Sequence, residues 1–256
     1  MKTVIKGVVH SIFLVFIILT GCRPKAINVS DSFDKPGLSS IWSTDRMETQ
    51  SFEIQSKIVH NGTGAAKITL RSKDTYEPSM DGDKPTERDE LREATTLFSV
   101  EDQLYDYRFS MFLPDTFPIV PVRLVIAQWK EYCNGKDSCS NDSPVVALRY
   151  VSDTLLITLN AGKHAKVLYK VRGTRDQWLD FDFLIRFTRN EDGIIVASIN
   201  NKEVVNYKGV TSYLNGNGYR LDKNRYYFKM GLYRDLMPEP MCIYIDDYSK
   251  KEISIK

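Results

Sequence analysis

The chain has 256 residues, 42% of them hydrophobic and 11% aromatic, and its formal net charge is +2 at pH 7. Because this charge is close to zero, bulk charge gives no reason to expect nucleic-acid binding, and an anion-binding role must come from local clusters of cations. A chain of this length can bury one large core, and it contains no internal repeat or low-complexity tract.

The first 21 residues have the layout of a signal peptide. Lys2 and Lys6 provide a positively charged start, and a mostly apolar stretch follows from 8 to 19. This stretch is shorter than the roughly 20 residues that a comfortable membrane span needs. The segment Leu19-Thr20-Gly21-Cys22 resembles the bacterial lipobox, so we expect Cys22 to carry a lipid. An uncleaved anchor and an ordinary secretory signal are the alternatives.

With Cys22 as the first mature residue, 22–29 form a short tether and 30–256 a single folded domain. Arg23 follows the cysteine, whereas aspartate at this place is associated with retention in the inner membrane. We therefore expect a lipoprotein of the bacterial outer membrane, periplasmic or surface-exposed. It would contact the membrane only through its N-terminal lipid.

Strand patterns dominate the remainder of the chain, and turn dipeptides such as Asn61-Gly62 and Asp192-Gly193 separate them. No long segment has the 3.6-residue period of a helix, although 91–104 leave room for a short helical turn. Many antiparallel strands joined by hairpin turns predict an all-β sandwich or jelly roll. The predicted strands are 65–70, 105–113, 123–129, 145–151, 154–160, 166–171, 181–188, 194–199, 202–207, 226–233 and 242–248.

Three further cysteines need a place. Cys133 and Cys139 flank a short polar loop, and in an oxidising periplasm we expect them to form a disulfide. The alternative is a metal pair, but no cluster of His or Cys joins them, so we expect no metal site. Cys242 lies in an apolar strand pattern and is predicted to be a buried free thiol.

Two charged segments have candidate binding residues at alternating positions. If 87–93 are extended, Arg88, Glu90 and Arg92 share one face. In such a row the glutamate can hold one arginine in place and leave the other free to bind the carboxylate of a ligand. On its own, the row also fits a solvated charged edge.

The strand pattern at 124–130 places Gln128 and Lys130 on one face and points Trp129 the other way. On its own this pattern also fits an ordinary strand end. The segment 225–235 alternates more clearly, and a surface strand with exposed aromatics is its plain alternative. Its predicted core face carries Phe228, Met230 and Leu232, and its opposite face carries Tyr227, Lys229, Gly231 and Tyr233.

Together, these segments resemble polysaccharide lyases with a β-jelly-roll fold, namely jelly-roll alginate lyases, heparin lyase I and glucuronan lyases. The resemblance lies in R-x-E-L-R at 88–92, Q-x-K at 128–130 and Y-F-K-x-G-x-Y at 227–233. The segment 177–181 also resembles the heparin-lyase group, where Trp178 would begin a core strand. The resemblance implies a concanavalin-like sandwich of two antiparallel sheets with a concave glycan-binding face. One departure is that Lys130 stands where these families usually have His.

The implied reaction is β-elimination at a uronic acid, without a metal or cofactor. Gln128 and an arginine, Arg88 or Arg92, would neutralise the carboxylate so that the neighbouring C5 proton can leave. Tyr233 is the expected acid and also a candidate base, although a tyrosine, with an ordinary pKa of about 10, needs cations nearby to act as one. Lys130 would bind carboxylate or sulfate, or replace Tyr233 as base. The expected substrate-binding residues are Arg92, Glu90, Lys229, Tyr227 and Arg234.

The expected partner is an anionic, uronate-containing polysaccharide, bound by a monomer. Near-neutral net charge argues mildly against a sulfated polymer and favours glucuronan or alginate-like chains. The main alternative is a non-catalytic glycan-binding lipoprotein on the same fold, which the absent histidine supports. A hydrolase of the concanavalin-like group is a third possibility, and it would need two carboxylates facing each other across the groove.

Overall fold

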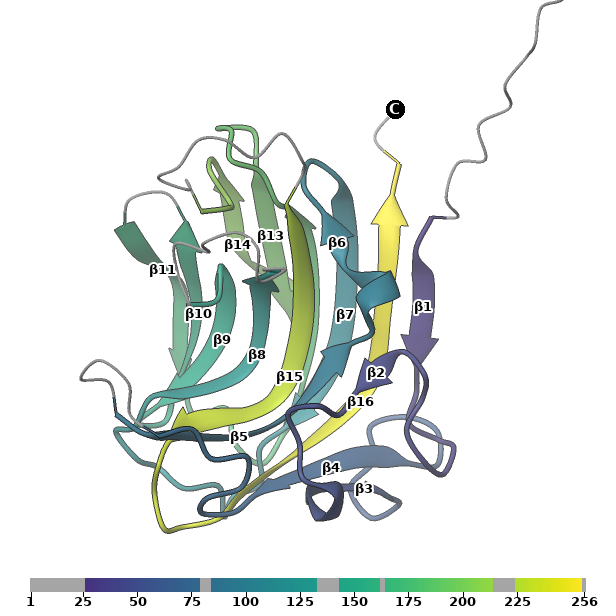
Figure 1. Cartoon of the computed structure of the whole chain (residues 1–256), viewed down its shortest axis with the longest axis vertical. Coiled ribbons are helices and arrows are strands. Elements are labelled where there is room, and N and C mark those ends of the chain that lie inside the picture. Colours follow the sequence, from purple (N-terminus) through teal and green to yellow (C-terminus); the bar gives the residue numbers. More distant parts are fainter. Residues whose placement is uncertain (1–25, 79–83, 133–142, 162–163, 214–223, 255–256) are drawn as a thin grey trace, which may run out of the picture.

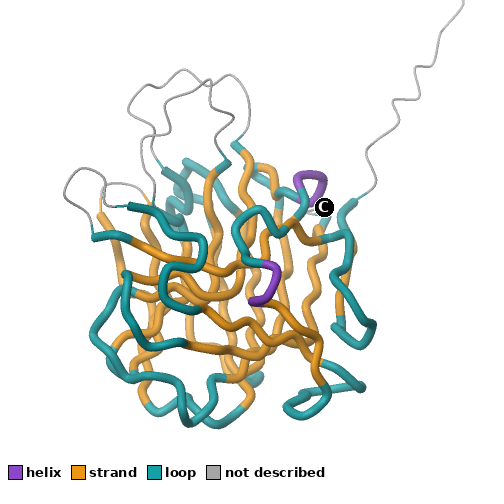
Figure 2. The backbone as a smooth tube through the Cα atoms, turned by 60° about the horizontal axis from the view of Figure 1, so that its bottom comes forward, coloured by secondary structure: helices purple, strands orange, loops and turns teal. Residues whose placement is uncertain are grey.

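The computed structural model describes residues 26–78, 84–132, 143–161, 164–213 and 224–254. Two antiparallel sheets, each of eight strands, lie face to face and curve together (Figure 1). Outside the strands, the described residues form loops and two short helical turns, η1 (Thr49–Ser51) and η2 (Thr95–Leu97) (Figure 2). No helix in the described part of the chain is long and apolar enough to span a membrane.

We call the first sheet the outer sheet. Its strand order is β14-β13-β12-β7-β16-β4-β3, with β1 also paired to β16. Its strands are β1 (Asn28–Asp31), β3 (Phe52–Gln55), β4 (Ala65–Leu70), β7 (Leu104–Phe112), β12 (Trp178–Arg186), β13 (Ile194–Ile199), β14 (Lys202–Lys208) and β16 (Met241–Ile253).

We call the second sheet the cleft sheet. Its strand order is β11-β10-β9-β8-β15-β5-β2, with β6 also paired to β15. Its strands are β2 (Trp42–Ser43), β5 (Thr86–Glu93), β6 (Ser99–Val100), β8 (Leu124–Glu131), β9 (Val146–Val151), β10 (Thr154–Ala161), β11 (His164–Arg172) and β15 (Arg225–Asp235).

The core between the sheets is rich in aromatic side chains. Trp129 of β8 is fully buried, and its ring centroid lies 4.7 Å from that of Phe183 in the outer sheet and 4.8 Å from that of Phe228 in β15. Burying side chains of this kind contributes roughly 1.5–3 kcal/mol each, and tilted ring pairs add to it. This packing fixes β8 and β15 relative to each other, so the side chains on their opposite faces also keep fixed relative positions.

A buried polar group also joins the two sheets. The Glu93 carboxylate of β5 accepts hydrogen bonds from the Tyr248 hydroxyl at 2.5 Å and from Lys250 Nζ at 3.0 Å, both on β16. Glu93 and Lys250 are 0% exposed. Removing one partner would leave an uncompensated buried charge, which typically costs 3–5 kcal/mol. This pair therefore fixes β5 relative to the outer sheet.

The all-β jelly roll and the expected strands are confirmed, and Trp178 begins β12. The helical turn anticipated within 91–104 is η2. The prediction for Cys242 is half wrong, because the thiol is free but only partly buried on the outer side of β16. The signal segment, Cys22 and the Cys133–Cys139 loop lie outside the described residues.

Candidate active site

The three charged segments lie on neighbouring strands of the cleft sheet. Across β15 and β5, Gly231 pairs with Glu90 and Tyr233 with Arg88. Across β15 and β8, Lys229 pairs with Gln128. Because residues directly opposite one another in a sheet point to the same face, the register brings all three motifs onto one surface. Trp129 points into the core, as its alternation predicts.

This surface is hollowed into a cavity of about 460 Å³. Its described lining carries six cationic side chains and one carboxylate, so the cavity attracts anions although the chain as a whole is nearly neutral. The lining residues are Arg46, Glu77, Pro78, Lys84, Thr86, Arg88, Arg123, Gln128, Lys130, Pro144, Lys229 and Tyr233.

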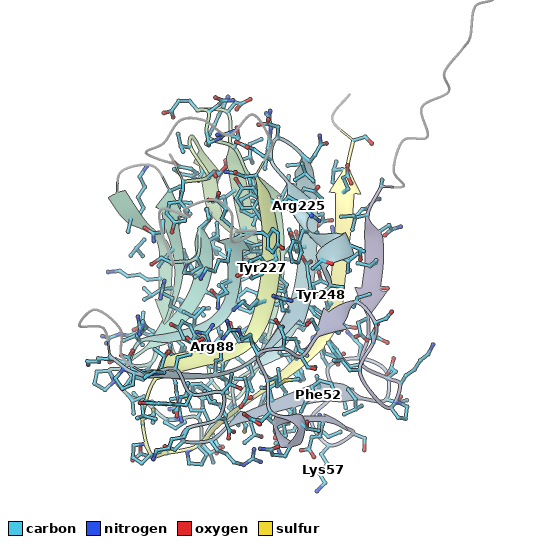
Figure 3. The ribbon with its side chains drawn as sticks, in the orientation of Figure 1. Phe52, Lys57, Arg88, Arg225, Tyr227 and Tyr248 are labelled. Atoms are coloured by element: carbon cyan, nitrogen blue, oxygen red, sulfur yellow. The ribbon has the colours of Figure 1, made fainter. Side chains whose placement is uncertain are left out.

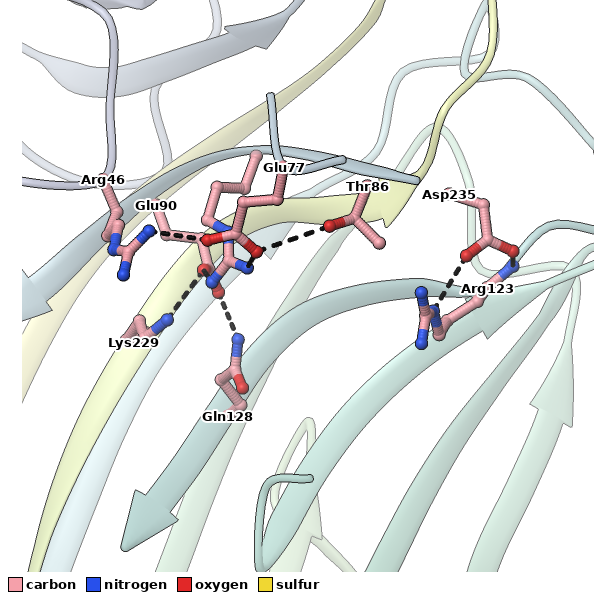
Figure 4. Close-up of polar contacts among 9 residues, drawn as sticks. Arg46, Glu77, Thr86, Glu90, Arg123, Gln128, Lys229 and Asp235 are labelled. Atoms are coloured by element: carbon pink, nitrogen blue, oxygen red, sulfur yellow. Dashed lines mark hydrogen bonds and ion pairs between the residues drawn. The ribbon is translucent and has the colours of Figure 1, made fainter. Parts of the chain in front are cut away.

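The Tyr233 ring lies among arginines. The Arg88 guanidinium carbon is 4.2 Å from the ring centroid, and that of Arg123 is 5.7 Å from it. Both distances fall in the range of cation–π contacts. Arg123 is held in place by Asp235, whose Oδ1 accepts a 2.8 Å hydrogen bond from its Nε (Figure 4). A tyrosine in this setting is partly immobilised, and two guanidinium groups lie close to its ring.

Glu90 organises the donors beside Tyr233. Its carboxylate is buried and accepts a 2.9 Å hydrogen bond from Lys229 Nζ and another from Gln128 Nε2, while Arg88 NH1 lies 3.8 Å away (Figure 4). Burial lowers the pKa of Lys229, and Glu90 opposes this shift. Glu90 thus acts as an anchor that orients the amide and the ammonium, instead of facing solvent.

Gly231 allows the strands to come this close. Its φ is +141°, a conformation that side chains disfavour, and a Cβ there would overlap the Asp89 carbonyl and the Cα of Glu90. The pairing of β15 with β8 also becomes irregular between Met230 and Tyr233. The absence of a side chain at Gly231 therefore allows β15 to lie close to β5.

Glu77 is a lining residue that the sequence motifs do not include. It pairs with Thr86, the first residue of β5, in an isolated antiparallel bridge. Its carboxylate forms ion pairs with Arg46, at 2.6 Å, and with Arg88 (Figure 4). Two of the cavity's cations, Arg46 and Arg88, are therefore already paired with a carboxylate of the protein itself.

Residues 34–249 match the family model described as polysaccharide lyase. The chain belongs to this family. No curated protein matches the sequence significantly.

Solved structures similar to this polysaccharide lyase include an endo-β-1,4-glucuronan lyase from the fungus Trichoderma reesei. Its TM-score is 0.67 at 16% identity, with 85% of this chain and 94% of that chain covered. A family 7 alginate lyase, A1-II′, has a TM-score of 0.55 at 12% identity, covering 82% and 84%. A GH131 β-glucanase domain from Podospora anserina has a TM-score of 0.55 at 15% identity, covering 88% of both. At these identities, the likeness establishes the fold alone.

Of the predicted substrate-binding residues, Lys229 lines the cavity, whereas Arg92 and Tyr227 lie outside it. Arg92 pairs with Asp45 at 3.1 Å, and Tyr227 packs against Phe98 with ring centroids 5.3 Å apart. Burial raises the pKa of Tyr227 to about 12. Figure 3 shows Tyr227 farther along the cleft sheet than Arg88.

Arg234 requires a correction, because it does not face the cavity of the lyase. It is 0% exposed on the core face of β15, and its NH2 forms a 2.7 Å ion pair with the equally buried Glu87. The strand alternation that brings Tyr233 to the surface turns the next residue inward. Arg234 is therefore a structural cation and not a subsite residue.

Proposed function

We propose that this polysaccharide lyase cleaves a uronate-containing anionic polysaccharide by β-elimination. The observation that carries the proposal is Tyr233, set among arginines on the wall of a cation-lined cavity, with the Gln128 amide on the neighbouring strand. A phenol can exchange a proton with the substrate, and the amide and arginines can stabilise negative charge on a carboxylate.

The first requirement of the reaction is neutralisation of the uronate carboxylate. An amide nitrogen has two N–H donors, and Gln128 gives one to Glu90, which leaves the second for substrate. Arg88 has five donors and spends part of them on Glu77. With the carboxylate held by these groups, negative charge that develops on loss of the C5 proton is stabilised in the transition state.

The second requirement is proton transfer at C5 and at the glycosidic oxygen. Tyr233, as phenolate, takes the C5 proton; the electron pair of the C5–H bond forms the C4–C5 double bond, and the C4–O bond breaks. The phenol then returns a proton to the departing oxygen. Lys130, in the place of the usual histidine, binds polymer carboxylate in this scheme.

Two of the similar structures carry the names glucuronan lyase and alginate lyase, and these names support glucuronan or alginate-like chains as the substrate. The test is ultraviolet absorbance of C4–C5 unsaturated uronate, measured with purified protein lacking residues 1–22. The panel holds alginate, glucuronan, heparin, heparan sulfate, chondroitin and hyaluronan. Absorbance that rises on one polymer supports the proposal; saturated products would instead indicate a hydrolase.

A non-catalytic glycan-binding protein is the second candidate, favoured by Lys130 and by the ion pair between Arg88 and Glu77. Binding of a polymer without any unsaturated product would support it. We further propose anchoring through a lipid on Cys22. Incorporation of labelled palmitate that disappears in Cys22→Ser would support the anchor, and equal labelling of both proteins would refute it.

A further inference from the structure

The cleft sheet carries a second cationic group on the far side of Tyr233 from Arg88. In the ladder, Arg88 of β5 pairs with Tyr233 of β15. Tyr233 pairs with Val125 of β8, and Val125 pairs with Arg149 of β9. Paired residues point to the same face, so these four positions form one row across the sheet. Arg149 therefore faces the same side as the catalytic candidate Tyr233.

Arg149 differs from the other arginines in this region by lacking an acidic partner. Arg88 pairs with Glu77 and Arg123 with Asp235. In the described parts of the chain, no carboxylate lies within 4 Å of an Arg149 nitrogen, and its Nε donates to the Thr158 hydroxyl at 3.2 Å. Arg149 is nevertheless partly buried, and this burial, together with nearby Arg123, lowers its pKa.

A partly buried charge also loses hydration, and a counter-charge offsets that cost. The position between Arg149 and Tyr233 in the row is Val125, so no large side chain from β8 separates them. The remaining guanidinium donors have the planar geometry that suits a carboxylate. An anion from outside the protein would supply the missing counter-charge.

We propose that Arg149, supported by Arg123, is a second carboxylate subsite that binds a uronate neighbouring the one that reacts. The proposal rests on the proposed function. In this row Arg149 lies two strand spacings from Tyr233, about 10 Å, which exceeds one sugar ring. The carboxylate at Arg149 therefore belongs to a different sugar from the one that reacts at Tyr233. The consequence is a preference for substrates with uronates on adjacent sugars over chains in which uronates alternate with hexosamines.

The test compares wild type, Arg149→Gln and Arg172→Gln on polyuronate oligomers of increasing length. Arg172 is an exposed arginine on β11 of the same sheet, so its variant removes the same charge from a remote place. We expect Arg149→Gln to raise KM roughly tenfold or more on long oligomers, as expected for a lost charge-assisted contact, with kcat within about twofold of wild type. The rise should vanish on the shortest cleaved oligomer, and Arg172→Gln should resemble wild type.

Three results would overturn the subsite. One is an unchanged KM at every length. Another is a fall in kcat that is equal on short and long oligomers, which would mean that Arg149 acts through Tyr233. The third is a larger loss on heparin than on polyuronate, which would identify sulfate as the ligand. If wild type forms no unsaturated product, the proposed function fails, and calorimetric binding of polyuronate to the same variants still decides the subsite.

Discussion

At the scale of single residues, the site depends on how each side chain is held by another. Tyr233 packs against Arg88, and the Arg88 guanidinium forms an ion pair with Glu77 and lies near Glu90. Gln128 is oriented by Glu90 as well. Groups that are fixed before the substrate arrives need no reorganisation during the reaction, which is where electrostatic catalysis gains most. Replacing a residue that reacts with the substrate should therefore change the kinetics differently from replacing a residue that only positions another.

Removing the Tyr233 hydroxyl should abolish turnover. Tyr233→Phe retains the ring that Arg88 and Arg123 contact, so we expect near wild-type stability and polymer binding. Initial rates of unsaturated-product formation and a thermal melt check this. Tyr169→Phe, on β11 of the same sheet, is the control. Wild-type-like turnover in Tyr233→Phe would remove this hydroxyl from the mechanism.

Gln128→Ala should lower turnover by more than about tenfold, equivalent to over about 1.4 kcal/mol of transition-state stabilisation. The reason is the loss of an amide donor directed at the substrate carboxylate. Steady-state kinetics with Gln177→Ala, a surface glutamine bonded to the Gly173 carbonyl, provide the comparison. An unchanged rate would contradict the role assigned to the amide.

Strand alternation is the reason that much of this site could be predicted from the sequence. It placed Tyr233 and Lys229 on one face and Trp129 on the other, and the register agrees. Alternation also places Arg234 in the core, and the sequence-based assignment of that residue to the substrate was wrong because it followed charge instead of period. Glu77 belongs to no pattern, since only tertiary pairing brings it to Arg88.

At the scale of elements, β5 is unusual because its core face is charged. Glu87 meets Arg234 and Glu93 meets Lys250, each pair fully buried. Hydrophobic periodicity is the main sequence signal of a strand, and these carboxylates erase it. For this reason β5 was recognisable only as a charged segment, whereas β15 and β12, with apolar inner faces, were predicted as strands.

The segment that precedes β5 allows a test of competition for Arg88. Because Glu77 already pairs with Arg46 and Arg88, substrate carboxylate must displace it or share those cations. Glu77→Gln should therefore lower KM roughly two- to fivefold, in keeping with the modest strength of a partly exposed ion pair. Michaelis kinetics on the cleaved polymer measure the change.

Glu53→Gln removes a similar exposed ion pair, with Lys67 on the outer sheet, and should leave KM unchanged. If Glu77→Gln instead lowers kcat while KM stays constant, Glu77 acts by orienting Arg88 and does not compete with the substrate.

At the scale of the whole molecule, one buried carboxyl links folding stability to pH. Asp89 is 0% exposed, its Oδ1 accepts a 2.8 Å hydrogen bond from the Glu48 amide, and burial raises its pKa to about 7. An unfolded aspartate titrates near pH 3.9. Between these values the folded protein holds a proton that the unfolded chain has lost, so stability declines as pH rises through about 7.

Asp89→Asn should remove this decline, because the amide keeps an acceptor for Glu48 and does not ionise. Urea unfolding at pH 5 and pH 8 measures it. Relative to wild type, the variant should gain stability at pH 8 and not at pH 5. Asp192→Asn, an exposed aspartate paired with Arg186, should leave the pH dependence unchanged. Equal pH slopes for wild type and Asp89→Asn would refute the assignment.

The pairing of β1 with β16 has a practical consequence. Asn28 lies opposite Lys251 and Asp31 opposite Tyr248, so both ends of the described chain meet on the outer sheet (Figure 1). The cavity opens on the other sheet. A bead, a solid support or a fused carbohydrate module attached at either end would be joined to the outer sheet. Immobilised preparations of this enzyme should thus keep the cavity on the cleft sheet accessible to polymers of any length.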